Sequence, residues 1–264
     1  GKSTILQALD FLSQMMIGQV QDWLDARGWK SHDLNCKLGK ESNLSFGVKY
    51  KTSTGQELNW VAIFNRVNLR CTSEAISVDG EKIFTASGQS FLFKGKTKQD
   101  ISFVFQGSLL SVLKDSELSD PVKEFRDALR KIRSLELLSP QMMRKRARTN
   151  DQDIGAGGEK LSAFLHCIKG DHRDRLLRML KGFYPKLLDF KVTSQKAGWK
   201  KLSVIEAFQD QKLETEATHL NDGLLRILAV LAQSESDRSL ILLDEIENGI
   251  NQEIVEKLVD TLVA

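Results

Sequence analysis

The chain has 264 residues and carries 38 Lys and Arg against 35 Asp and Glu, a formal net charge of +3. This balance excludes a strongly basic nucleic-acid coat protein and an acidic tail protein, but it leaves room for a local basic patch. Hydrophobic residues make up 41% of the sequence, which is enough for one large domain or two intimate lobes with a sizeable core.

The cysteines Cys36, Cys71 and Cys167 are scattered and form no CxxC pair. This spacing excludes a disulfide framework and a zinc knuckle, and it is typical of proteins of a reducing cytoplasm. No apolar run approaches the roughly 18 residues of a membrane-spanning helix, and no signal peptide is visible. We therefore expect a cytoplasmic protein without a membrane partner.

The first predicted element is a helix with an apolar face made by Ile5, Leu9, Leu12 and Met16. From about residue 44 the hydrophobic period changes to two, which predicts an antiparallel meander. The expected strands are 44–50, 58–64, 67–71, 75–78, 82–85, 90–93 and 101–105. Asp79-Gly80 lies between two alternating runs and is a two-residue hairpin signal.

The pattern becomes helical from Asp120, which we expect to cap a helix with Pro121 at its first position. The apolar stripe of this helix is Val122, Phe125, Leu129 and Ile132. Further helices are predicted at 159–169, 171–182, 224–231 and 250–262, and further strands at 188–192, 202–207 and 240–243. No heptad pattern is sustained, so no coiled-coil arm fits inside the chain.

Gly1-Lys2-Ser3-Thr4 opens the first helix and matches the end of the phosphate-binding pattern G-x-x-x-x-G-K-[ST]. The backbone N–H groups and the dipole of a helix N-terminus favour an anion. Lys2 would bridge the β- and γ-phosphates, and the Ser3 hydroxyl would ligate Mg²⁺. The alternative is an ordinary Ser/Thr-capped helix start. Because the first glycine of the pattern and the preceding strand are absent, we expect that the natural beginning is missing.

The segment 240–245, LILLDE, has four apolar residues followed by two acids. It predicts a buried parallel strand with carboxylates at its carboxyl end, where open α/β sheets bind ligands. Asp244 would hold Mg²⁺ through its water shell, and Glu245 would polarise the attacking water as a general base. The alternative is a core strand that runs into a solvated acidic turn.

Asn221, Asp222 and Gly223 form a short polar turn before an apolar helix. Such a turn at a helix N-terminus can face a phosphate. The alternative is a plain N-cap, with Asn221 or Asp222 as the capping residue.

Taken in order, GKST, LNDGLLRILAVLA and LILLDEIENGI resemble the ATPase heads of the ABC superfamily, and most closely SMC/RecF-like AAA-family ATPases of DNA repair and prokaryotic defence. In that family these segments are Walker A, the signature motif and Walker B with its D-loop. The segment 154–165, IGAGGEKLSAFL, is similar to the family's lobe segment. The resemblance implies an α/β P-loop NTPase fold of the ABC-ATPase head type, with an antiparallel β subdomain and a helical lobe.

The resemblance also implies one head over residues 1–264. Its first part, 1–106, would hold the Walker A helix and the β subdomain. The helical lobe would span 107–187. The signature, Walker B and D-loop part of the core would follow at 188–264, and the chain ends before the strand that carries the family's switch histidine could occur.

The resemblance implies the following site residues. Gly1, Lys2, Ser3 and Thr4 would hold the triphosphate, with Mg²⁺ between Ser3 and Asp244, and with Glu245 as the catalytic acid. The signature residues Asn221, Asp222 and Gly223 would reach the γ-phosphate of ATP held by a second copy, and Asn248 and Asn251 would lie in the D-loop that crosses this homodimer. Gln106 is the candidate for the Q-loop glutamine, with a surface glutamine at a strand end as the alternative.

Two positions depart from the family pattern. Asn221 stands where Ser is usual, and Asn251 stands where Asp or His is usual. The first departure puts the contact with the second copy in doubt.

A basic cluster of Arg144, Lys145, Arg146 and Arg148 is a candidate contact for nucleic-acid phosphates, with Arg130, Lys131 and Arg133 nearby. The alternative is a solvated helix face and loop.

The expected function is ATP binding and hydrolysis as a conformational switch, with DNA or an effector protein as a further partner and with a role in DNA repair or anti-phage defence. One alternative is a nucleotide-gated scaffold with little turnover, which the Asn221 departure favours. Another is the ATPase subunit of a membrane transporter, against which the LNDG form and the strands before residue 105 argue.

Overall fold

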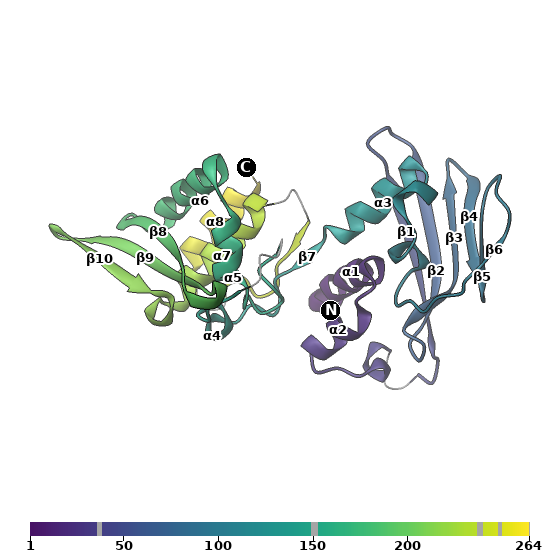
Figure 1. Cartoon of the computed structure of the whole chain (residues 1–264), viewed down its shortest axis with the longest axis horizontal. Helices are drawn as coiled ribbons and strands as arrows, with labels where there is room; N and C mark the ends of the chain where they lie inside the picture. Colours follow the sequence, from purple (N-terminus) through teal and green to yellow (C-terminus); the bar gives the residue numbers. More distant parts are fainter. Residues whose placement is uncertain (36–38, 149–152, 237–239, 248–249, 264) are drawn as a thin grey trace. The chain divides into compact units, whose positions relative to one another are not determined.

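The computed structural model describes the chain except residues 36–38, 149–152, 237–239, 248–249 and 264 (Figure 1). It is mixed α/β, with antiparallel sheets and helices, which confirms the predicted class at this level. The chain divides into two compact units, Gly1–Ile132 (unit 1) and Arg133–Ala264 (unit 2), and each is described by itself. The boundary between the units falls inside the segment 107–187 that we predicted to be a single helical lobe.

Unit 1 consists of helices and a six-stranded antiparallel sheet in which the strands pair in chain order, as the period-two pattern predicted (Figure 1). Its helices are α1 (Lys2–Ile17), α2 (Val20–Ala26) and α3 (Asp120–Arg130). Its strands are β1 (Asn43–Lys51), β2 (Glu57–Asn65), β3 (Arg70–Val78), β4 (Glu81–Ser87), β5 (Ser90–Phe93) and β6 (Gln99–Asp100). Short 3₁₀ turns lie at Ser31–Leu34, Leu109–Ser111 and Asp115–Glu117.

The hairpin at Asp79-Gly80 is confirmed, because both residues have positive φ values, +50° and +82°, as a type I′ turn requires. The two strands predicted at 67–71 and 75–78 are one strand, β3. The strand β3 begins later than predicted, at Arg70, because residues 66–69 form a turn. Asn65 Oδ1 closes this turn by accepting hydrogen bonds from the backbone N–H groups of Val67 (3.1 Å) and Asn68 (3.0 Å).

The strand predicted at 101–105 is wrong. Regular pairing ends with the two residues of β6, and Val104 is 97% exposed. The chain leaves the β5 edge here and crosses to the start of β3, where Gly107 N donates to Leu69 O (2.8 Å) and Gly107 O accepts from Cys71 N (2.7 Å). These bonds to a distant strand cannot be read from the local pattern.

The predicted first helix is confirmed as α1, but its buried face lies further along than the pattern indicated. Ile5 is 65% exposed, whereas Phe11, Met15 and Met16 are buried. The Phe11 ring packs edge-on against that of Phe64 on β2, with 5.2 Å between centroids. The stripe of α3 is buried as predicted, although its N-cap is Ser119 and Asp120 is already the first helical residue.

Unit 2 has a three-stranded antiparallel sheet, β10-β9-β8, and a short parallel pair, β11 with β7. Its helices are α4 (Pro140–Met143), α5 (Leu161–Cys167), α6 (Gly170–Phe183), α7 (Asp222–Ser236) and α8 (Gln252–Val263). Its strands are β7 (Arg133–Ser134), β8 (Leu187–Ser194), β9 (Lys200–Phe208), β10 (Gln211–Glu216) and β11 (Ile241–Leu242). Short 3₁₀ turns lie at Lys196–Gly198 and Ala217–His219.

Helix α7 is central to the core of unit 2, because every residue from Leu224 to Ala232 except Arg226 contributes a buried apolar side chain. Helices α5, α6 and α8 and strands β8 and β9 supply much of the rest of this core (Figure 1). Strand β10 was not predicted, because its one apolar residue, Leu213, is 52% exposed and gives no alternating pattern.

Candidate functional site

The predicted phosphate-binding residues form the N-terminus of α1. Gly1 is the N-cap, Lys2, Ser3 and Thr4 make the first turn, and all four are exposed. None of the described side chains caps the N–H groups of the first turn. No acidic residue lies in this turn, so the positive end of the helix dipole is uncompensated and available to an anion.

The other end of α1 is fixed within unit 1. Arg130 Nε donates to Met16 O (2.8 Å), and Ser108 N donates to Met15 O (2.9 Å). Gly107 lies so close to this end that a Cβ there would be 2.2 Å from Met15 O, so only glycine fits. The segment from Gln106 to Ser108 is therefore packed tightly against the helix that carries the candidate phosphate site.

Gln106 caps a helix in this structure. Its Oε1 accepts a hydrogen bond from Gln21 N (3.0 Å), which belongs to the first turn of α2. The alternative of a surface glutamine at a strand end does not fit, because residues 101–105 form no strand and Gln106 is half-buried. Its role toward nucleotide stays a prediction.

The sequence analysis missed Glu74, a carboxylate of β3 that is only 2% exposed. It accepts hydrogen bonds from Ser108 Oγ (2.5 Å), Leu109 N (2.6 Å) and Trp60 Nε1 (3.1 Å). Burial raises the pKa of the Glu74 carboxyl, and the three donors partly oppose this shift. The available signal was an acid on the inward face of a strand, two residues before buried Ile76.

We expect Glu74→Ala to destabilise unit 1 by about 2–4 kcal/mol, because it leaves three buried donors without an acceptor. The free energy of unfolding, measured in urea, checks this. Glu81→Ala, which removes an exposed carboxylate from the neighbouring strand β4, is the matched control and should change stability by less than about 1 kcal/mol. Equal effects of the two changes would contradict the assigned role of Glu74.

The predicted acidic pair follows a parallel strand in unit 2. β11 pairs with β7 in the register Ile241 to Arg133 and Leu242 to Ser134, so the predicted parallel orientation is confirmed. The predicted strand is only partly buried, because Leu242 is buried whereas Leu240 is 55% exposed.

Asp244 is half-buried just after the strand, and Glu245 is exposed. Glu245 has a φ of +49°, a left-handed conformation that costs a residue with a side chain about 1–2 kcal/mol. Its N–H donates to Asp244 Oδ1 at 3.2 Å. Strained backbone of this kind is concentrated at functional sites, so it adds weight to a role for this acidic turn.

The polar turn before α7 is an N-cap, as one of the two alternatives predicted. Asn221 Oδ1 accepts from Leu224 N at 2.7 Å. Arg144 Nη2 donates to Leu220 O and to Asp222 Oδ1, both at 2.6 Å, and so fixes the turn from the side of α4. Asn221 and Asp222 stay exposed and Gly223 is half-buried, which leaves the predicted contact with a second copy untested.

In the D-loop region, Asn248 lies outside the described residues. Asn251 precedes α8, and its Oδ1 accepts from Glu253 N at 3.1 Å. Asn251 is thus an N-cap, and the polar side chain that departs from the family pattern has a local structural role.

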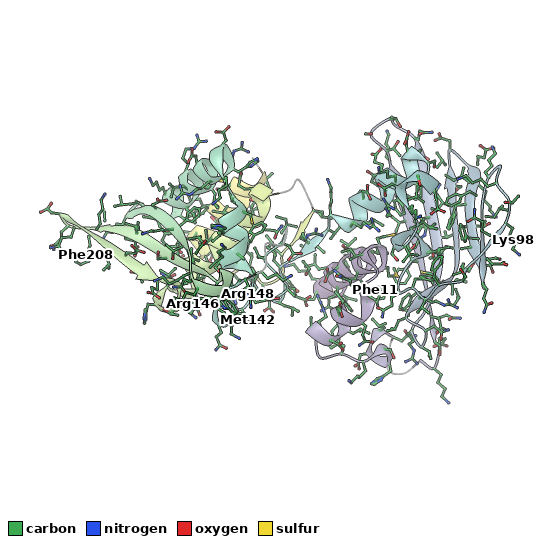
Figure 2. The ribbon with its side chains drawn as sticks, viewed as in Figure 1. Phe11, Lys98, Met142, Arg146, Arg148 and Phe208 are labelled. Carbon is green, nitrogen blue, oxygen red and sulfur yellow. The ribbon has the colours of Figure 1, made fainter. Side chains whose placement is uncertain are left out.

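The basic cluster is divided between the units. Arg130 is engaged by backbone carbonyls in unit 1, whereas Arg146 and Arg148 are exposed near α4 in unit 2 (Figure 2). Ala147 forms an antiparallel bridge with Lys200 at the start of β9. The guanidinium carbon of Arg148 consequently lies 5.8 Å from the centroid of the Trp199 ring.

The predicted residues that the structure describes therefore fall into two groups, one in each unit. Gly1–Thr4 and Gln106 belong to unit 1, and Asn221–Gly223, Asp244, Glu245 and Asn251 belong to unit 2. In the part of the chain that the structure describes, no three His, Cys, Asp or Glu side chains are grouped to hold a metal ion. A magnesium ion at Ser3 or Asp244 would thus depend on water molecules and phosphate oxygens for most of its ligands, as is usual for Mg²⁺ at nucleotides.

Within the described ranges, no helix is both long and apolar enough to cross a membrane. No protein-family model, curated protein or solved structure matches the chain.

Proposed function

We propose that the chain binds and hydrolyses ATP as an ABC-type ATPase head with a P-loop NTPase core, and that it uses this reaction as a conformational switch. The observation that carries the proposal is the first turn of α1, which consists of Lys2, Ser3 and Thr4 and contains no acidic residue. This arrangement suits the phosphates of a nucleotide. The acidic turn after β11, with its strained Glu245, supports the same function.

In the proposed mechanism, the N–H groups of the first turn of α1 and the Lys2 ammonium hold the phosphates. Ser3 and Asp244 would be the residues that hold a magnesium ion, and the ion would supply charge neutralisation to the phosphates. Glu245 accepts a proton from the water that attacks the γ-phosphate. The chain thereby positions the reacting groups and stabilises their charge, and it forms no covalent intermediate.

We further propose that two copies form a homodimer around ATP, with the turn at Asn221, Asp222 and Gly223 facing the nucleotide of the other copy. The exposure of Asn221 and Asp222 is compatible with such a contact. DNA is the further partner that the exposed Arg146, Arg148 and Trp199 favour, since guanidinium groups bind phosphates and an exposed indole can stack on a base. The proposed setting is cytoplasmic, in DNA repair or anti-phage defence.

Metal removal tests this mechanism. Phosphate release from ATP by the complete protein is expected to fall to the background rate when Mg²⁺ is chelated with EDTA, and to return when Mg²⁺ is added back. A second arm with added DNA is expected to change the rate. Turnover that persists in EDTA would contradict the assignment of Ser3 and Asp244 to a magnesium ion.

A further inference from the structure

A cationic cleft that the proposed ATPase does not use lies in unit 2. It has a volume of about 180 Å³ and opens between the end of α5, the start of α6 and strand β8. Its lining residues are Leu165, His166, Ile168, Lys169, Arg173, Phe190, Lys191 and Val192. Four of these side chains carry or can carry a positive charge, and none is acidic, so the lining favours an anion.

His166 lines this cleft and has a ring nitrogen without a hydrogen-bond partner among the described residues. This nitrogen, Nδ1, is fully buried. Desolvation lowers the pKa of the His166 ring, and the charges of Lys169 and Lys200 lower it further. Buried polar atoms are rarely left without a partner, so a rotation of the ring that brings this nitrogen into the cleft would let a bound group satisfy it.

Arg173 is held in place for binding. Its Nη2 donates to Asp189 Oδ1 (2.6 Å) and to Phe190 O (2.8 Å), and its guanidinium carbon lies 4.8 Å from the centroid of the Phe190 ring. Its Nε and Nη1 have no hydrogen bond to any part of the chain that the structure describes. A fixed guanidinium with donors to spare is a preorganised partner for an oxyanion.

The two lysines of the lining differ in availability. Lys169 is exposed and makes no ion pair with a described residue. The amine of Lys191 instead lies 3.8 Å from a Glu214 carboxylate oxygen, so its charge is shared. Lys169 is therefore the amine that can move onto a ligand.

The edge of the sheet adds a backbone donor. β8 is an edge strand, and the N–H and C=O of Phe190 bond to the side chains of Asp189 and Arg173 rather than to β9. Because alternate residues of an antiparallel strand point their backbone groups to the same side, the Val192 N–H faces the same free edge. Hydrogen-bond donors from the end of α5, the start of α6 and the edge strand β8 thus line the same cleft.

We propose that this cleft binds a phosphate group, as inorganic phosphate or as the phosphate of a small metabolite, through His166, Lys169 and Arg173. A phosphate dianion has oxygens for several donors that approach from different directions, which matches this arrangement. The cleft lies wholly in unit 2, whereas Gly1–Thr4 lie in unit 1. The proposal therefore stands or falls independently of the ATP site.

The histidine ring signals of the complete protein test this site by nuclear magnetic resonance. The signals of His166 are assigned by their loss in His166→Gln. At constant ionic strength they should shift saturably with sodium phosphate, with a dissociation constant of about 1 mM or below, and AMP in a parallel titration reports whether a nucleoside phosphate fits. Lys169→Ala should weaken phosphate binding about tenfold. Lys181→Ala, on the exposed side of α6, and Lys2→Ala should leave the titration unchanged.

Four results would overturn the proposal: no saturable His166 shift below about 10 mM phosphate, the same shift with chloride, a titration that Lys169→Ala leaves unaltered, or a titration that Lys2→Ala abolishes. The last result would assign the shift to the nucleotide site. Because Lys169 is exposed, its removal should leave the fold intact, and circular dichroism of Lys169→Ala checks this.

Discussion

Replacing Glu245 with glutamine is expected to lower the rate of ATP turnover by about 10²–10³-fold while ATP affinity changes by less than about twofold. Glutamine keeps the size of the side chain but cannot accept a proton from the attacking water. Because Glu245 is exposed, the substitution should leave the fold intact. Steady-state phosphate release and equilibrium ATP binding by the same preparation separate the two effects.

The same variant distinguishes an ATPase from a nucleotide-gated scaffold. In an ATPase, Glu245→Gln should trap ATP-bound dimers, which light scattering would detect as a doubled mass. In a scaffold, the mutation should alter neither turnover nor mass. Glu253→Gln, an exposed change in the first turn of α8, is the matched control. Equal turnover in Glu245→Gln, Glu253→Gln and the unmodified protein would contradict the catalytic role.

Replacing Lys2 with alanine is expected to weaken ATP binding by about 10–100-fold, which corresponds to about 1.4–2.7 kcal/mol. Lys2 is exposed in the first turn of α1, so its ammonium would contact phosphate rather than support the fold. Calorimetric titration with ATP and Mg²⁺ measures the loss. Lys82→Ala removes an exposed lysine from β4 of the same unit and should bind ATP as the unmodified protein does.

An unchanged ATP affinity in Lys2→Ala would mean that GKST is only a helix start, which is the alternative that the tetrapeptide left open. A loss of affinity in both lysine variants would indicate a general effect of positive charge on unit 1. Only the selective loss supports a phosphate site at the N-terminus of α1.

Local sequence pattern predicted those parts of the fold whose side chains alternate or repeat against a core. The helix α3 and the hairpin at Asp79-Gly80 are examples, because Val122 and Phe125 face the core and both hairpin residues have positive φ values. Strand β10 was not predicted, because its apolar residue Leu213 is exposed and does not pack against a core. The boundary between the two units at residue 132 could not be predicted, because no Pro- or Gly-rich linker marks it in the sequence.

Those parts of the candidate site that follow a local sequence motif could be predicted. The parts that depend on tertiary contacts between distant segments could not. The acidic turn follows a parallel strand as the run of apolar residues indicated. In contrast, the binding of Gln106 to the first turn of α2 and the burial of Glu74 under Ser108 depend on segments that are 85 and 34 residues away. The hydrophobic periodicity of a single segment cannot predict contacts between residues so far apart in the sequence.

Phosphate release from ATP by the complete protein, compared with Lys2→Ala and Lys82→Ala under identical conditions, tests the central claim most directly. The account predicts magnesium-dependent, saturable turnover that Lys82→Ala retains and that Lys2→Ala loses at ATP concentrations well below saturation. Turnover by Lys2→Ala equal to that of the unmodified protein across the whole ATP range would contradict it.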